Sequence, residues 1–395
     1  MLEFSESKLK QFNEAGFVYD LSLFLPFERN CNMKIKFSYL IGLLALPYIF
    51  QSCETDVDVL APYEDISVVY GLLDEDSTRQ YIKINKLFQT TGDANSGASD
   101  RDSQEYDTIS GSVYEIDPSG TVLNEYPLQE TEDVPKDSGL FYYPEQTLYY
   151  FDGNVSSDNT YELNFTNAEG NSVTASTNIV GKELYPIDGW ESPNYMISFV
   201  RSTATINDNL SIEIKSGDNA SAFEMYFTFR YRDIYMDDTE SDVIEIRTPV
   251  GSYNFDGSER YNVSYNSTLI LNQILNNVPD IAETPNVKVR IPLDTCIKVE
   301  LTYSNEELMY YMMVNEPSTS LSEEKPEYTN VNDGLGIFAS RTFWTRNYLM
   351  NSYTHTFIAG EMDPTTIDDE LTLSLYNQFP PKGFCDNRGN PTGCN

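Results

Sequence analysis

Histidine and cysteine are scarce in this chain of 395 residues, which has one histidine and five cysteines. A closed structural zinc site needs clustered Cys and His ligands, so the composition argues against one. His355 is also the only residue that could serve as a histidine base for a serine or cysteine nucleophile. No Gly-x-Ser-x-Gly sequence accompanies it, and it lies in the alternating stretch Tyr353–Phe357. We therefore expect His355 on the surface of a β-strand, without a catalytic role.

Positive charge is scarce as well. The chain has 25 Lys and Arg against 62 Asp and Glu, a formal net charge of −37. A field of that sign repels a phosphate backbone, so nucleic acid is not an expected partner. The densest acidic run can supply oxygen ligands for Ca²⁺, but it lacks the Asp-x-Asp-x-Asp-Gly pattern of a calcium loop. We expect solvated loops and no cofactor, and Ca²⁺ is the open alternative. The residues of this run are Asp237, Asp238, Glu240 and Asp242.

Long apolar runs are missing after Cys53, where none approaches the roughly 20 residues of a membrane-spanning helix. One shorter run precedes it. Phe37–Phe50 is uncharged, follows Lys34 and Lys36, and ends at Ser52 and Cys53. A basic start, a short apolar stretch and a small residue near the cleavage point are typical of a secretory signal. Residues 33–52 resemble a lipoprotein signal peptide, which implies that Cys53 is lipidated and anchors the chain to a membrane.

The position of this signal raises a question about the residues before it. A signal should begin the chain, so we expect Met33 to be the true start and residues 1–32 to come from a mis-called start. A real N-terminal extension, with an amphipathic helix around Ser7–Phe17, is the alternative. After the lipid site, residues 53–63 are an acidic tether. Surface exposure is favoured over the periplasmic face, because Glu54, Asp56 and Asp58 resemble the acidic export tags of Bacteroidota lipoproteins.

Aromatic residues are abundant, with 29 Tyr and 21 Phe, which favours strands over helices. Short alternating stretches separated by turn residues continue from Ile66 to Ile179. They predict an N-terminal β-sandwich of immunoglobulin-like or transthyretin-like type over residues 64–182. We expect residues 92–108 to be a mobile loop.

A larger β-rich domain is expected over residues 183–395, because longer strand candidates continue to Glu370–Tyr376. Two helices should interrupt its strands, near residues 267–277 and 304–315. In the second of these, Ser304 is the expected N-cap. The predicted fold class is thus mainly β, a sandwich followed by a β-rich domain with a few short helices.

Gly334-Leu335-Gly336-Ile337-Phe338-Ala339 matches the glycine pattern of a dinucleotide site. That pattern binds a pyrophosphate only where a strand leads into a glycine turn that opens a helix. Here a polar loop precedes it and strand-like residues follow. We expect a buried structural turn and strand, packed against the sheet of the second domain, in which the glycines allow positive φ or close backbone packing.

Three cysteines follow the lipid site. Cys385 and Cys394 lie in a tail rich in Pro and Gly and are the expected disulfide pair, since an oxidising envelope permits such bonds. Cys296 is expected to be a buried thiol.

Several stretches together resemble an uncharacterised family of Bacteroidota outer-membrane lipoproteins. They are the strands Val-Val-Tyr-Gly-Leu-Leu (68–73) and Tyr-Ile-Lys-Ile (81–84), and above all the run from Glu327 to Phe338. The resemblance implies an immunoglobulin-like N-terminal domain and genes beside TonB-dependent receptors. Its characteristic residues, which we interpret as structural, are Tyr328, Asn330, Gly334, Gly336 and Phe338. Ser77 and Thr108 also resemble the O-glycosylation sites of that phylum.

Three functions follow as expectations. The first is a lipid-anchored outer-membrane binding or accessory protein, whose partner is a TonB-dependent receptor or another envelope complex. The second is a surface hydrolase that cleaves glycans or peptides with paired carboxylates. The third is a structural or adhesive envelope protein with Ca²⁺ in its acidic loops. No catalytic residue can be assigned from the sequence, and we lean towards a protein that is not an enzyme.

Overall fold

Alternating apolar residues build the first lobe of this computed structural model, which describes residues 64–89, 94–167, 169–181, 190, 192, 194–208, 210–315 and 327–385. Strands β1 (Ser67–Leu73) and β2 (Arg79–Lys86) each bury every second residue, as period-two alternation predicts. The other elements of this lobe are α2 (Ala94–Ala98), α3 (Arg101–Gln104), β3 (Ser110–Ile116), β4 (Val122–Pro127), β5 (Gln129–Thr131), β6 (Leu148–Asp152), β7 (Thr160–Thr166) and β8 (Ser172–Asn178).

Two sheets pack face to face in this lobe. One has the order β15-β8-β7-β3-β4, and the other contains β1, β2, β6 and β5. Side chains from both sheets form a single buried core, which includes Val69, Ile82, Tyr161 and Leu163. The expected sandwich arrangement is present, and the mainly β fold class is confirmed.

The second lobe contains longer strands and most of the helices. Its strands are β9 (Met196–Ile197), β10 (Leu210–Lys215), β11 (Ala222–Tyr235), β12 (Ile244–Asn254), β13 (Arg260–Tyr265), β14 (Val287–Ser304), β15 (Val331–Asn332) and β16 (Gly334–Met350), of which β15 and the start of β16 reach into the first lobe. Its helices are α4 (Ser267–Asn277), α5 (Glu306–Asn315), α6 (Ser352–Ile358) and α7 (Glu370–Tyr376), with short 3₁₀ turns at Ile281–Glu283, Pro364–Thr366 and Pro380–Lys382.

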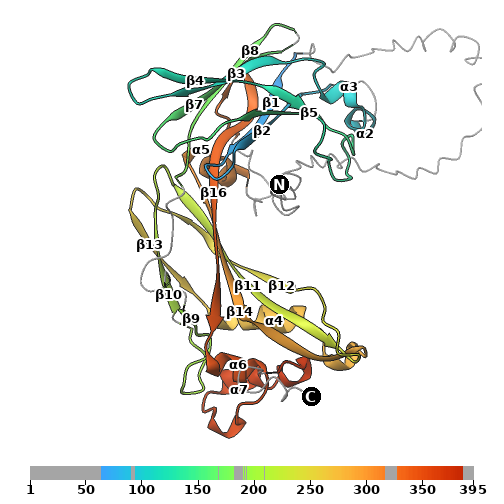
Figure 1. The fold of residues 1–395 in the computed structure, drawn as a ribbon, viewed down its shortest axis with the longest axis vertical. Coiled ribbons are helices and arrows are strands. Elements are labelled where there is room, and N and C mark those ends of the chain that lie inside the picture. The colour runs from blue at the N-terminus through green and yellow to red at the C-terminus, as the bar shows by residue number, and fades with distance from the viewer. Residues whose placement is uncertain are drawn as a thin grey trace, which may run out of the picture.

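Strand β16 belongs to both lobes. Its first part, from Gly334 to Ser340, pairs in parallel with β1, and its second part, from Arg341 to Tyr348, pairs antiparallel with β14. The result is one continuous sheet with the order β12-β11-β14-β16-β1-β2-β6-β5. Figure 1 shows β16 running from the upper lobe to the lower one along the long axis of the molecule. The two lobes are therefore joined by backbone hydrogen bonds on both sides of one strand.

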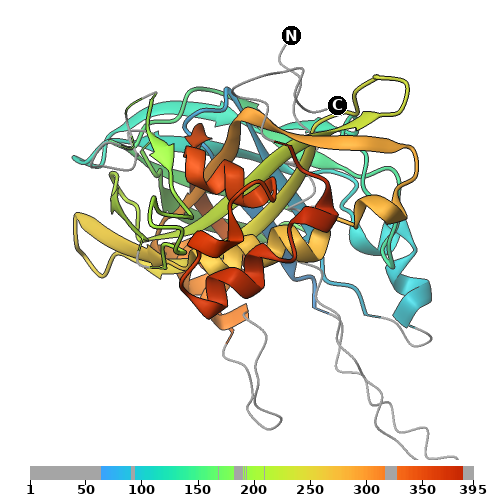
Figure 2. The ribbon, with the colours of Figure 1, turned by 90° about the horizontal axis from the view of Figure 1, so that it is seen from below.

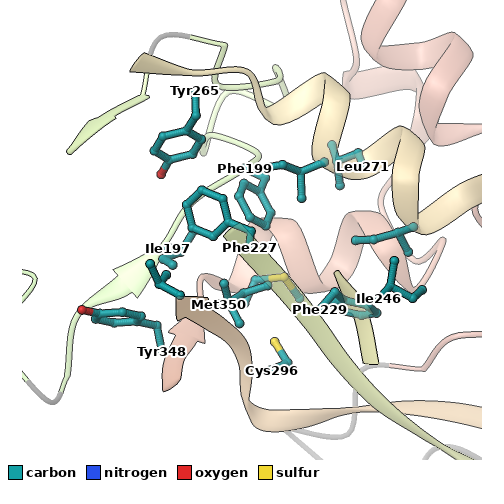
Figure 3. Close-up of a cluster of buried hydrophobic side chains, with 14 of the residues drawn as sticks. Ile197, Phe199, Phe227, Phe229, Ile246, Tyr265, Leu271, Cys296, Tyr348 and Met350 are labelled. Carbon is teal, nitrogen blue, oxygen red and sulfur yellow. The ribbon is translucent and has the colours of Figure 1, made fainter. Parts of the chain in front are cut away.

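The core of the second lobe lies on one face of this sheet. Alternating residues of β11, among them Phe223, Met225, Phe227 and Phe229, point into it and meet α4, α6, α7 and the pair β10–β13. Figure 3 shows Phe227 and Phe229 of β11 in this cluster, together with Leu271 of α4 and Cys296 of β14. Seen from below in Figure 2, the red C-terminal helices lie across the end of the lobe in front of the long strands.

Two segments that we expected to be strands are helices. His355 lies in α6 and is buried, not on a strand surface, and the expected strand Glu370–Tyr376 is α7. In both helices an N-cap side chain satisfies a backbone N–H. Asn351 accepts from Thr354 N at 3.0 Å, and Asp369 accepts from Thr372 N at 2.7 Å. A short apolar run fits both the 3.6-residue period of a helix and the two-residue period of a strand. These caps and the packing of one face selected the helix.

Two smaller differences concern helix starts and loops. The expected mobile loop at 92–108 contains α2 and α3. In α5 the N-cap is Asn305, whose side chain accepts from Leu308 N at 3.2 Å. Ser304, the expected cap, is the last residue of β14.

Phe338 tests the shared strand. Its ring is fully buried in the core of the first lobe, not against the sheet of the second domain where we expected it. Phe338→Ala should lower the free energy of unfolding by about 3–5 kcal/mol, the usual cost of emptying a buried aromatic site. Urea unfolding measures this. Leu335→Ala is the matched control, because Leu335 is 37% exposed on the same strand. Equal effects of the two substitutions would contradict this placement.

Candidate functional site

Helix α5 is the least expected feature of the surface. Seven of its ten residues are Leu, Met, Tyr or Val, yet only Leu308 is buried. A helix that is apolar on all sides is normally enclosed in a core or a membrane. This one lies at the junction of the two lobes, beside β16 (Figure 1). Its exposed side chains are therefore a candidate interaction surface.

A small apolar cluster holds α5 on the sheet. Leu308 packs with Ile337 and Ala339 of β16, and the partly buried Tyr70 and Tyr311 complete the contact. These strand residues lie on the face opposite the sandwich core, since Phe338, between them in sequence, points into that core. Burial, with the neighbouring Tyr70, raises the pKa of the Tyr311 hydroxyl.

The start of α5 is fixed by a polar anchor. Asn305 is buried, and its side-chain amide donates to Thr177 Oγ1 at 2.7 Å and to the Asn178 carbonyl at 2.9 Å. Its backbone N–H donates to the Ser340 carbonyl at 3.2 Å. One residue thus caps the helix and ties it to β8 and β16. This anchor fixes the position of the first turn of α5 relative to β8 and β16.

The outward side of α5 carries large apolar groups. The exposed fractions are 41% for Tyr310, 37% for Met312 and 52% for Met313. Leu335 continues the surface on β16, and the Tyr310 ring lies 5.8 Å from that of Tyr328. Methionine and tyrosine are frequent at binding surfaces, since Met adapts its shape and Tyr adds a hydroxyl to a large contact area. We call these residues, together with α5, the α5 surface.

The residues of the motif Glu327–Phe338 support this surface from within. Asn330 accepts from Phe338 N at 2.9 Å, and its amide donates to the Phe338 carbonyl at 2.6 Å, so a side chain pairs with β16 as a strand would. Tyr328 packs on the α5 cluster. Gly336 has φ +102°, and an added Cβ would lie 2.0 Å from the Val69 carbonyl oxygen. A Cβ added at Gly334 would lie 2.8 Å from the Ser67 carbonyl oxygen. A strand, not a helix, follows these glycines, so the dinucleotide geometry is absent here.

The acidic run expected as a Ca²⁺ alternative lies in the turn between β11 and β12. Asp237 accepts from Thr239, Asp238 pairs with Lys288 at 3.0 Å, and Glu240 pairs with Arg232 at 2.9 Å. Among the residues that the structure describes, no group of three or more His, Cys, Asp or Glu side chains is arranged to hold a metal ion. The Asp242 carbonyl accepts a hydrogen bond from the Ser241 hydroxyl.

The remaining sites predicted from sequence lie apart from α5. Thr108 is exposed before β3, whereas the Ser77 hydroxyl donates to the Arg79 carbonyl at 2.8 Å. Cys385 forms a disulfide and Cys296 is a buried thiol. Cys53 and Cys394 lie outside the described residues, so lipidation and the Cys385–Cys394 pairing stay predictions. No helix in the described ranges is long and apolar enough to cross a membrane.

One cavity brings together residues that could suggest hydrolysis. A space of about 410 Å³ is lined by Ser352, His355 and Asp294, with Met196, Leu349 and Met350. A serine triad requires a buried carboxylate that holds the imidazole in place. Asp294 is exposed, and so does not meet that requirement. We assign no chemistry to this cavity.

The sequence predicts a helix at α5 but not its exposure. The residue types gave a signal, because an apolar helix without a polar face must meet something apolar. What covers each side depends on strands far away in sequence, and no local pattern encodes that. No sequence motif indicates that Lys83 and Lys136 belong to the same surface.

Glu307 offers a test of the setting of α5. Burial, with a smaller effect of the Glu306 charge, raises its pKa above the ordinary value. An acid whose pKa is raised by folding favours the folded state below its unfolded pKa, and this contribution is lost as the pH rises through the folded pKa. Glu307→Gln should therefore raise the melting temperature at about pH 8 and have less effect at about pH 4.5. Thermal melts at both pH values check this, with Glu370→Gln as control, because Glu370 is an exposed acid in the first turn of α7. A gain independent of pH would contradict it.

Comparison with protein-family models and with curated proteins found no match for this chain. The resemblance therefore rests on the sequence stretches quoted above, and the function has to be argued from the α5 surface.

Proposed function

We propose that this chain is a lipid-anchored binding protein of the outer membrane that holds a partner protein through the α5 surface. The observation that carries the proposal is an apolar helix of which a single residue is buried. Apolar patches of this kind, fixed in place by a rigid scaffold, are typical of protein interaction sites. The partner we propose is a TonB-dependent receptor or another β-barrel of the same membrane.

The segment of residues 33–52, which resembles a lipoprotein signal peptide, supports the same proposal. Acyl chains on Cys53 restrict the protein to the membrane in which such a receptor lies. Restriction to a surface raises the effective concentration of two partners, so that a small interface is sufficient. Rigid placement of α5 by Asn305 also lowers the entropy lost on binding, because the helix is already ordered.

Cys53→Ser tests the anchor. Loss of the acyl chains should move the protein from the membrane fraction to the soluble fraction, since no other membrane segment is predicted after Cys53. Cell fractionation and intact mass measure this. Ser52→Ala is the control, because it keeps a small residue directly before Cys53 and leaves the cysteine in place. A Cys53→Ser protein that stays with the membrane would refute the signal assignment.

The α5 surface is tested by affinity purification from detergent-solubilised outer membrane. Wild-type protein should recover a β-barrel. Met312→Lys with Met313→Lys should reduce recovery at least about tenfold, because two charges would be desolvated against an apolar partner. Leu371→Lys is the control, since Leu371 is 55% exposed on α7, at the end of the second lobe away from α5 (Figure 1). Thermal melts confirm folding of each variant. Unchanged recovery with the double variant would reject this surface.

A further inference from the structure

Lys83 lies next to the α5 surface on the same side of the sheet. It pairs in register with Tyr70, which packs under α5, and Tyr70 in turn pairs with Ile337 of β16. Adjacent strands lie about 4.8 Å apart, so Lys83 is only one strand spacing away from the residues that α5 covers. The lysine is thus part of the same face as the exposed apolar groups.

The segment before β6 covers the other side of Lys83. Lys83 Nζ donates to Gln146 Oε1 at 2.9 Å, and the Gln146 amide donates to the Val134 carbonyl at 3.2 Å. Lys136 comes from the same segment, and its Nζ lies 5.1 Å from the centre of the Phe141 ring. Large apolar side chains of this segment are exposed, with fractions of 59% for Leu140 and 49% for Tyr143. Lys83 therefore has Tyr70 on one side and, on the other, the segment that carries Lys136 and these exposed apolar side chains.

The charge of Lys136 adds to the electrostatic cost of a charged Lys83. Burial, and next the charge of Lys136, lowers the pKa of Lys83 to about 8. Burial also lowers the pKa of Lys136. Glu105 favours the charged forms of both, but its carboxylate is held by Arg101 and Thr147. In the described part of the chain, neither lysine forms an ion pair.

The two arginines of β2 and α3 have carboxylate partners. Arg79 pairs with Asp152 at 2.7 Å, and Arg101 pairs with Glu105 at 2.8 Å. In a chain with a formal charge of −37, two adjacent lysines without an acidic partner are conspicuous. A carboxylate from outside would relieve both the burial cost and the mutual repulsion.

We propose that Lys83 and Lys136 together bind a carboxylate of an acidic, apolar-rich peptide segment, whose apolar side chains pack on α5 and on Leu140–Tyr143. The inference rests on the proposed function, in which this face binds a partner protein, and it names the chemistry of the segment bound. The rest of the surface repels such a segment, so that the net charge adds selectivity for this one face.

The test uses a fluorescent twelve-residue peptide of alternating Glu and Leu, with its Gln–Leu analogue as the uncharged probe. Fluorescence anisotropy should show binding of the acidic peptide and at least about tenfold weaker binding of the analogue, the expected effect of losing a charge-assisted hydrogen bond. Lys83→Met and Lys136→Met should each weaken binding by a similar factor. Lys288→Met should not, because that lysine pairs with Asp238 in the other lobe.

A second readout separates recognition from simple packing. A bound carboxylate raises the pKa of Lys83, which faces Lys136 and Glu105, so binding at about pH 8 should take up protons. Calorimetry in two buffers of different ionisation enthalpy measures this uptake. Equal binding of the two peptides, no binding of the acidic peptide, or full affinity in the lysine variants would overturn the proposal. If the lysine variants still recover the β-barrel and the α5 double variant does not, the proposed function stands and this inference falls.

Discussion

The close approach of β1 and β16 is the constraint on which the rest of the structure depends. At Gly336 the strand passes so near the Val69 carbonyl that no side chain fits, and its φ of +102° suits glycine. This contact brings a strand from late in the chain into the core of the first lobe. The same strand then pairs with β14 in the second lobe. Stability of either lobe is thereby coupled to the other, because both share one set of backbone hydrogen bonds.

This arrangement also explains why α5 is where it is. The helix follows β14 directly and precedes the motif that leads into β16, so it must lie near the point where the two lobes meet. Asn305 fixes its first turn against β8 and β16. Only one side of a helix in that position can contact the sheet. The apolar residues of the other side remain outside, which is the physical origin of the candidate interaction surface.

Much of the local structure was predictable. The period-two pattern located β1, β2, β7 and β8, and the spacing of Leu271, Ile274 and Leu275 located α4. The pattern failed at His355 and at Glu370–Tyr376, where a few residues fit both periods and a capping side chain selected the helix. The candidate site was predicted in part. The strand from Gly336 to Ser340 is buried as expected, whereas the turn before it is partly exposed, with Leu335 37% exposed. The lysine pair joins residues 53 positions apart, and no pattern along the chain brings such residues together.

By itself, the sequence determined the mainly β fold class and the alternating strands, such as β1 and β2. Each of these depends on the identity of residues close together in the chain, through alternation, turn residues and charge. Tertiary structure alone decided that β16 serves both lobes, that α5 stays exposed, and that Lys83 lies beside Lys136. These features depend on which strand pairs with which, and that choice is made by the packing of the whole core.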